Sequence, residues 1–336
     1  MNGPADVDRA LVEHGDRVFN SGPVTLTKAR RGMTGLRVVG PRATPARGPK
    51  ADAQAIRKAL GAIVKRTPQV MVRISGGGKN IRHIKAHLDY ISRNGQIPLE
   101  DQNGDKLSGK DDINALRDEW QHGGFPIPDE GEVRQAFNII LSMPAGTDEY
   151  TVLLAARDFA KSEFENFQYA MALHTMDTDP DKSPSPNPHV HLCVKAVGLD
   201  GVRLNPRKND LQRWRERFAQ RLRDYGVEAD ATRRVHRLQR VRGEKQSVRY
   251  MKARGDSLHA IGSSPANLAR IAKSKKFELD MLNRFHKLAA TLAKSDDPRD
   301  RGLAIGIVRR VSARDQYPTK APERSLERGA AERPKD

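Results

Sequence analysis

The chain has 336 residues and is strongly basic, with 60 Lys and Arg against 42 Asp and Glu and a net charge of +18. This length accommodates one large domain with extensions or two ordinary domains, and the charge points to a polyanionic partner. One cysteine excludes an intramolecular disulfide, no apolar run approaches the ~20 residues of a membrane span, and the first residues lack a signal-peptide core. We therefore expect a cytoplasmic protein without membrane insertion.

The elements expected from periodicity, caps and turn residues alternate between strands and helices. In chain order they are a strand at 69–75, a helix at 81–95, a hairpin or irregular segment at 95–109, a helix at 110–124, a strand at 132–144, a helix at 148–164 that Thr147 caps, strands at 166–175 and 188–198, and a helix at 209–226. The short intervals fit an antiparallel sheet with helices packed on it, so the expected class is α+β.

Both ends of the sequence differ from this middle part. Residues 1–68, rich in Pro, Gly, Ala and Arg, are expected to be a disordered, flexible extension with a short helix over 53–65. Residues 236–336 are expected to be basic helical pieces, of which 266–294 is the best, and an exposed tail. Residues 231–336 alone contain 26 Lys and Arg against 12 Asp and Glu, a net charge of +14. The folded domain is therefore predicted at 69–235.

Three histidines indicate a metal site. In a strand, residues two apart share a face, so His189 and His191 project together from an otherwise apolar segment. His174 ends the preceding strand, and pairing of the two strands would bring three imidazoles together. Three neutral nitrogens with open positions are typical of a catalytic metal site. We expect Cys193 to be a core thiol on the opposite face.

Between these histidines lies a loop with three acids, Asp177, Asp179 and Asp181. One of them could accept the second imidazole proton of a ligand histidine and fix its tautomer, while the others face solvent. Two competing motifs carry less weight. His83 and His87 have the spacing of a helical zinc pair without the Glu of a metalloprotease, and Gly76–Asn80 lacks the spacing of a phosphate loop.

Three segments in this order, "HLDYISRNG", "LSMPAGTD" and "NPHVHLCVKA", resemble the motifs of conjugative relaxases, the tyrosine HUH endonucleases that nick DNA at an origin of transfer. The resemblance is to the mobilisation-type branch that includes the border endonuclease of plant-tumour plasmids, and it covers roughly 69–235. It implies a five-stranded antiparallel sheet, Tyr90 as the nucleophile, and His174, His189 and His191 as ligands of Mg²⁺ or Mn²⁺.

The resemblance also implies a DNA contact for Ser142 near the scissile phosphate, and the basic residues Lys85, Arg93 and Lys195 are expected to contribute to DNA binding. The sequence departs from the family pattern in a Pro-rich insertion after His174, so the assisting acid has two candidates, Asp177 first and Asp179 second. Lys195 stands where the family often has Asn.

The implied reaction is transesterification: the phenol oxygen attacks the backbone phosphorus, forming a 5′-phosphotyrosine and a free 3′ hydroxyl. The implied partners are single-stranded and hairpin DNA at the origin, relaxosome accessory proteins and a type IV coupling protein. The implied location is the bacterial cytoplasm, with export to a recipient cell together with DNA. The Arg-rich segment 320–336 is the candidate export signal.

The sequence leaves other hypotheses about the function open. A rolling-circle replication initiator would share the chemistry but place His-x-His before the tyrosine, whereas Tyr90 comes first here. A non-enzymatic nucleic-acid-binding protein would need no nucleophile, and a metal-dependent nuclease that uses water would leave no protein on the cut strand. Tyr250, in a basic segment, is the second candidate for the nucleophile.

Overall fold

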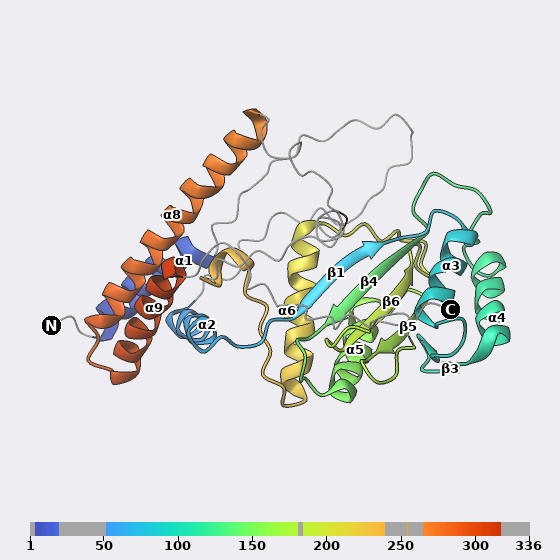
Figure 1. Cartoon of the computed structure of the whole chain (residues 1–336), viewed down its shortest axis with the longest axis horizontal. Helices are drawn as coiled ribbons and strands as arrows, with labels where there is room; N and C mark the ends of the chain where they lie inside the picture. The colour runs from blue at the N-terminus through green and yellow to red at the C-terminus, as the bar shows by residue number, and fades with distance from the viewer. Residues whose placement is uncertain (1–3, 20–51, 181–183, 239–253, 255–264, 317–336) are drawn as a thin grey trace, which may run out of the picture. The chain divides into compact units, whose positions relative to one another are not determined.

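A computed structural model describes residues 4–19, 52–180, 184–238, 254 and 265–316 (Figure 1). The described residues divide into two compact units. One comprises residues 65–233, and the other combines residues 4–19 and 52–64 with residues from 234 onward. Tyr250 and the segment 320–336 lie outside the described residues, as does most of the predicted N-terminal extension.

The 65–233 unit is built on a six-stranded sheet in the order β1-β4-β6-β5-β2-β3, with every neighbouring pair antiparallel. The strands are β1 (Met71–Gly76), β2 (Leu99–Asp101), β3 (Lys106–Leu107), β4 (Ala136–Ser142), β5 (Tyr169–His174) and β6 (His189–Lys195). The α+β class and the antiparallel sheet are confirmed. The resemblance implied five strands, whereas the sheet has six. The segment 95–109, expected to be a hairpin or irregular, contributes the short β2–β3 pair.

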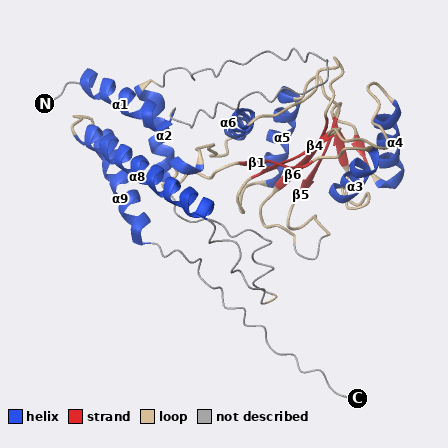
Figure 2. Ribbon diagram, turned by 90° about the horizontal axis from the view of Figure 1, so that it is seen from above, coloured by secondary structure: helices blue, strands red, loops and turns tan. Residues whose placement is uncertain are grey.

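Helices cover both faces of this sheet. They are α3 (Ile81–Ile91), α4 (Gly109–His122), α5 (Glu149–Glu163) and α6 (Lys208–Asp224). Figures 1 and 2 show α5 and α6 along one side of the strands. Asp148, rather than the expected Thr147, caps α5, because its carboxylate accepts a hydrogen bond from the backbone N–H of Thr151.

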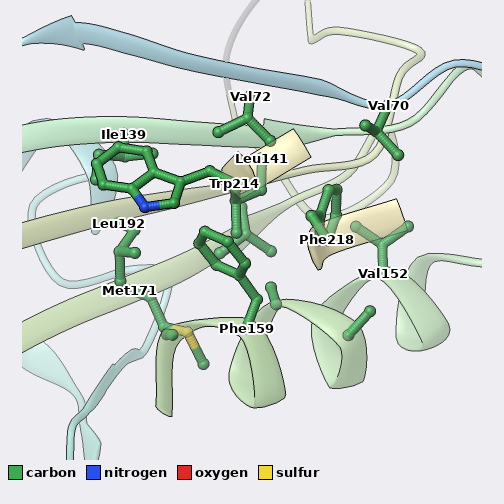
Figure 3. Close-up of a cluster of buried hydrophobic side chains, with 14 of the residues drawn as sticks. Val70, Val72, Ile139, Leu141, Val152, Phe159, Met171, Leu192, Trp214 and Phe218 are labelled. Atoms are coloured by element: carbon green, nitrogen blue, oxygen red, sulfur yellow. The ribbon is translucent and has the colours of Figure 1, made fainter. Parts of the chain in front are cut away.

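Alternating residues of the central strands divide the sheet into two different faces. Val190, Leu192 and Val194 of β6 point toward α5 and α6, where they join a core that contains Phe159 and Trp214 (Figure 3). This core is rich in aromatic rings, with Phe164 and Trp214 in edge contact at 5.4 Å between ring centroids. Burial of its apolar side chains stabilises the unit.

The other face of the sheet packs against α3 and α4. Ile84 and Leu88 of α3 and Trp120 of α4 bury against small residues of the strands, among them Ala172 and Cys193. The small side chains allow the helices to approach the sheet closely. Cys193 is buried in this core, as predicted, but the expectation that it points away from the histidines was wrong. It follows His191 by two residues along β6 and therefore shares the face that carries His189 and His191.

The other unit is a helical bundle of α1 (Pro4–Phe19), α2 (Ala53–Lys65), α8 (Pro265–Ala293) and α9 (Pro298–Gln316), with a short 3-10 helix at Arg234–His236. The helix over 53–65 is confirmed, α8 and α9 agree with the helical pieces expected after residue 236, and α1 was not expected. Leu11, Leu60 and Phe285 share its buried core. Segments from both ends of the sequence thus form one core. Among the described residues, no helix combines the length and apolar character that crossing a membrane requires.

Candidate active site

Strand pairing places the three histidines together. His174 at the end of β5 lies directly opposite His189 at the start of β6, and His191 follows on the same face. The ring centroids of His174 and His191 are 4.6 Å apart, and those of His189 and His191 are 5.0 Å apart. One nitrogen from each ring lies within 4.8 Å of the others. The predicted convergence of three imidazoles is therefore present.

Backbone carbonyls fix which nitrogen of two of these rings carries the proton. Nε2 of His174 lies 2.6 Å from the carbonyl oxygen of Ile91, and Nδ1 of His189 lies 2.9 Å from that of Asn187. Because a carbonyl can only accept, each of these nitrogens is the donor, which leaves a lone pair on Nδ1 of His174 and on Nε2 of His189. Such outer contacts are what orients metal-ligating histidines.

Burial favours the neutral form of His191 and of His174. It lowers the pKa of His191 to about 2, with smaller contributions from the neighbouring histidines and Arg93. Burial also lowers the pKa of His174, against the opposing effects of Ile91 and Asp179. Neutral imidazole is the form that binds a metal ion. Nδ1 of His174 and Nδ1 of His191 are buried without a hydrogen-bond partner, so this donor set fits a cation.

The acid beside the histidines is Asp179. Its Oδ2 lies 3.1 Å from Nδ1 of His174, and both its oxygens accept hydrogen bonds of 2.7 Å from Arg93. Asp177, the first choice from sequence, is exposed. The geometry therefore favours the second choice over the first. Asp179 differs from Asp177 in being buried against His174 and Arg93. No local sequence pattern reveals which acid of the loop is buried.

The turn after α3 brings Arg93 to this acid. Arg93, Asn94 and Gly95 follow one another with φ values of 51°, 56° and 88°, a left-handed conformation that is uncommon for residues other than glycine. A side chain at Gly95 would meet the backbone of Gly109 at 2.6 Å, so only glycine fits there. The two-point contact with Asp179 holds the strained Arg93 and raises the pKa of its guanidinium, with a smaller contribution from Tyr90.

Tyr90 lies against the histidine cluster. Its ring meets that of His191 edge-on, with 5.8 Å between centroids, and stacks on His87 at 6.2 Å. The guanidinium carbon of Arg93 lies 4.7 Å from the ring centroid. Tyr90 is 52% exposed, so its phenol can be reached by a polymer in solvent. His87 and Tyr90 are three residues apart on α3, so they share one helix face, and this face is turned toward His191 of β6.

The expected DNA-contacting residues have different surroundings. Ser142 ends β4 directly opposite His189, where its side chain is buried and shares the histidines' face. Lys85 forms an ion pair with Asp89 one helical turn away. Lys195 is buried and donates to the carbonyl of Gly123 and the side chain of Gln168, and burial lowers its pKa. The prediction of a DNA contact for Lys195 is contradicted by this burial.

Comparisons with known proteins agree with this geometry. The family model of the MobA/VirD2-like relaxase nuclease domain matches residues 96–227, which include the three histidines, Ser142 and Asp179 but not Tyr90. The T-DNA border endonuclease VirD2 of Agrobacterium fabrum is 29% identical over 186 residues, which cover 50% of this chain and 40% of that protein.

VirD2 of Rhizobium radiobacter gives the same identity over 186 residues and 43% of its length, and VirD2 of Rhizobium rhizogenes is 31% identical over 121 residues and 28% of its length. The chain thus spans less than half the length of these curated relatives. The resemblance to relaxases is confirmed: residues 96–227 match the model of the MobA/VirD2-like relaxase nuclease domain.

Proposed function

We propose that this protein is a DNA relaxase: it nicks one strand at the origin of transfer of a plasmid or integrative element and carries that strand in conjugative transfer. Tyr90 is the nucleophile, and the product is a 5′-phosphotyrosine link. The observation that carries the proposal is the edge contact between the Tyr90 ring and His191, with three imidazoles gathered behind it. A phenol and a cation-binding cluster beside each other are what phosphoryl transfer to tyrosine requires.

The other tyrosines that the structure describes are poorly placed for this role. Tyr169 is buried in the core, and burial raises the pKa of its phenol to about 12. Tyr150 lies on α5, on the opposite side of the sheet. Tyr225 donates a hydrogen bond to Asp158. Of these four, Tyr90 alone combines exposure with contact to the histidines.

His174, His189 and His191 would hold the metal ion. When bound, the ion supplies positive charge to the non-bridging oxygens of the scissile phosphate. We propose Mg²⁺ or Mn²⁺; three imidazole donors favour Mn²⁺, because Mg²⁺ prefers oxygen ligands. Asp179 lies beside Nδ1 of His174, the nitrogen that would bind the ion, and accepts two hydrogen bonds from Arg93. One carboxylate thus adds negative charge next to the metal site and holds the cation beside Tyr90.

The chain's own residues prepare the phenol. Tyrosine has an ordinary pKa of about 10 and must lose its proton on attack. The guanidinium of Arg93, whose carbon lies 4.7 Å from the ring centroid, places a positive charge beside the tyrosine that would attack the phosphate. The Oη–P bond forms as the bond from phosphorus to the 3′ oxygen breaks, and the phenol proton ends on that oxygen. Because the phosphoester is conserved, the reaction can run backward and rejoin the strand.

The proposed partners are single-stranded and hairpin DNA at the origin, accessory proteins of the relaxosome and a type IV coupling protein. Ser142, in line with His189 on the sheet, is the proposed contact near the scissile phosphate. The net charge of +18 supplies non-specific attraction to the DNA backbone.

The test is the formation of a covalent adduct. The protein is incubated with Mn²⁺ and labelled single-stranded oligonucleotides that tile the DNA around its own gene, and the products are separated under denaturing conditions. We expect an adduct that is absent in Tyr90→Phe and in the presence of a chelator, and that persists in the control Tyr150→Phe. An adduct that persists in Tyr90→Phe contradicts the assignment, and a cut strand without attached protein indicates hydrolysis by water.

A further inference from the structure

Strand β1 presents an exposed row of side chains on the same face of the sheet as the histidines. Met71 pairs with Ser142, which pairs with His189, and Arg73 pairs with Ile140, which pairs with His191. Directly opposed residues in antiparallel strands point to the same side. Met71 and Arg73, which we call the β1 face, therefore lie on the histidine side of the sheet.

No helix covers the β1 face in the described part of the unit. The core under α3 and α4 draws its strand residues from β2, β4, β5 and β6 and none from β1. Val72 of the same strand and Val70, which directly precedes it, are buried in the core under α5 and α6. Met71 is 44% exposed although it is apolar, and Arg73 is exposed. β1 thus has one face for the core and one face open to solvent.

Arg73 differs from the other cations near the site. Arg93 is held by Asp179, Lys85 pairs with Asp89, and Lys195 is buried. The Arg73 side chain has no hydrogen bond or ion pair with any residue that the structure describes. Its charge is therefore available to an anion from outside the chain.

We propose that the β1 face binds the single-stranded DNA that flanks the scissile phosphate, with Arg73 on a backbone phosphate and Met71 against the apolar face of a base. The inference rests on the proposed function and extends its DNA contacts beyond the nucleotide that reacts. Arg73 and His191 are separated by two strand spacings of about 4.8 Å, so roughly 10 Å. At about 3.4 Å per stacked nucleotide, this distance corresponds to some three nucleotides from the scissile phosphate.

Charge and continuity favour DNA as the occupant. The net charge is +18, and Arg73, which has no ion-pair partner among the described residues, lies next to the site where a phosphodiester would bind. An exposed apolar side chain beside a cation suits a base and its phosphate, because single-strand binding combines contact with base faces and charge along the backbone. A polypeptide strand added to the β1 edge would instead use the backbone, and substitutions of these side chains would then have little effect.

The first test measures affinity for a labelled oligothymidylate of roughly 20 nucleotides over a range of salt concentrations. We expect Arg73→Gln to weaken binding about 5- to 10-fold and to lower the slope of log affinity against log salt by about 0.7, the loss of one phosphate contact. Met71→Ala should weaken binding about 3-fold, and Met71→Leu should retain it. The matched control, Lys161→Gln, removes one charge from α5 on the other side of the sheet and should change affinity less than about 2-fold.

The second test uses a photo-crosslinking amino acid at position 71, compared with the same amino acid at position 161. We expect a crosslink to the oligothymidylate only from position 71. Affinities of Arg73→Gln and Met71→Ala equal to that of Lys161→Gln, or equal crosslinking at both positions, would overturn the inference. If Tyr90-dependent adducts form while Arg73→Gln binds normally, the inference fails and the proposed function stands. If binding depends on Arg73 but no adduct forms, the inference stands and the proposed function fails.

Discussion

The two faces of the central sheet show how one strand can serve stability and chemistry at once. On β6, Val190 and Leu192 point into an apolar core, and His189 and His191 point toward α3. The first face is packed with apolar side chains, although the indole N–H of Trp214 is buried there without a hydrogen-bond partner. The second face gathers three imidazoles, with one nitrogen of each within 4.8 Å of the others, beside an exposed phenol. Packing alone does not explain such a cluster, so the convergence of the imidazoles marks the site.

The largest effect is expected on the apolar face. Phe159→Ala removes a fully buried ring and should lower the free energy of unfolding by about 3–5 kcal/mol. Tyr90→Phe, on the other face, should change it by less than about 0.5 kcal/mol. Urea unfolding followed by tryptophan fluorescence measures this, because both tryptophans, Trp120 and Trp214, lie in the 65–233 unit. If the two substitutions lowered the free energy of unfolding equally, the two faces of the sheet would not differ in their contribution to stability.

A smaller loss of unfolding free energy is expected from a substitution of the buried acid beside the histidines. Asp179→Ala leaves the mostly buried Arg93 without its two-point partner and should cost about 3 kcal/mol of unfolding free energy. The matched substitution Asp177→Ala, two residues away and exposed, should cost less than about 0.5 kcal/mol. The same unfolding measurement compares them. A larger cost for Asp177→Ala would return the assisting role to the first choice made from sequence.

The polar face should also make stability depend on pH. Burial lowers the pKa of His87 from 6.5 to about 4, so between these values the unfolded chain binds a proton that the folded chain does not. Stability is therefore full above about pH 6.5 and falls as the pH falls toward 4. His87→Phe keeps an aromatic ring beside Tyr90 and should reduce the loss between about pH 7.5 and 5 by roughly 1–2 kcal/mol.

The measurement is the free energy of unfolding of both proteins at each pH. Because burial also lowers the pKa of His191 and of His174, part of the pH dependence should remain in His87→Phe. If both proteins lost the same unfolding free energy between about pH 7.5 and 5, the His87 ring would be solvated in the folded protein.

The smallest effect concerns Lys195, which shares the histidines' face but lies buried at its far end. Lys195→Met should change affinity for single-stranded DNA less than about 2-fold, because the ammonium group points to Gly123 and Gln168 instead of solvent. Circular dichroism confirms that the variant is folded before affinity is measured. A loss as large as that expected for Arg73→Gln would place Lys195 on the DNA after all.

Strand periodicity and residue chemistry were enough to predict the α+β sheet and the meeting of the three histidines. Both depend on local rules: alternation along a strand, and pairing of consecutive antiparallel strands. The sequence named Asp179 only as the second candidate for the assisting acid, and it did not predict the burial of Lys195. Both depend on which side chain folds inward and on contacts distant in sequence, such as Arg93 with Asp179. The extents 1–68, 69–235 and 236–336 remain a prediction, although α1 and α2 share a core with α8 and α9.

The most direct test of the central claim locates the covalent bond. The adduct is trimmed with nuclease and digested with trypsin, and mass spectrometry then identifies the modified residue. We expect the nucleotide on Tyr90, in the tryptic peptide AHLDYISR of residues 86–93. A nucleotide on Tyr250, or on any other tyrosine, would contradict it.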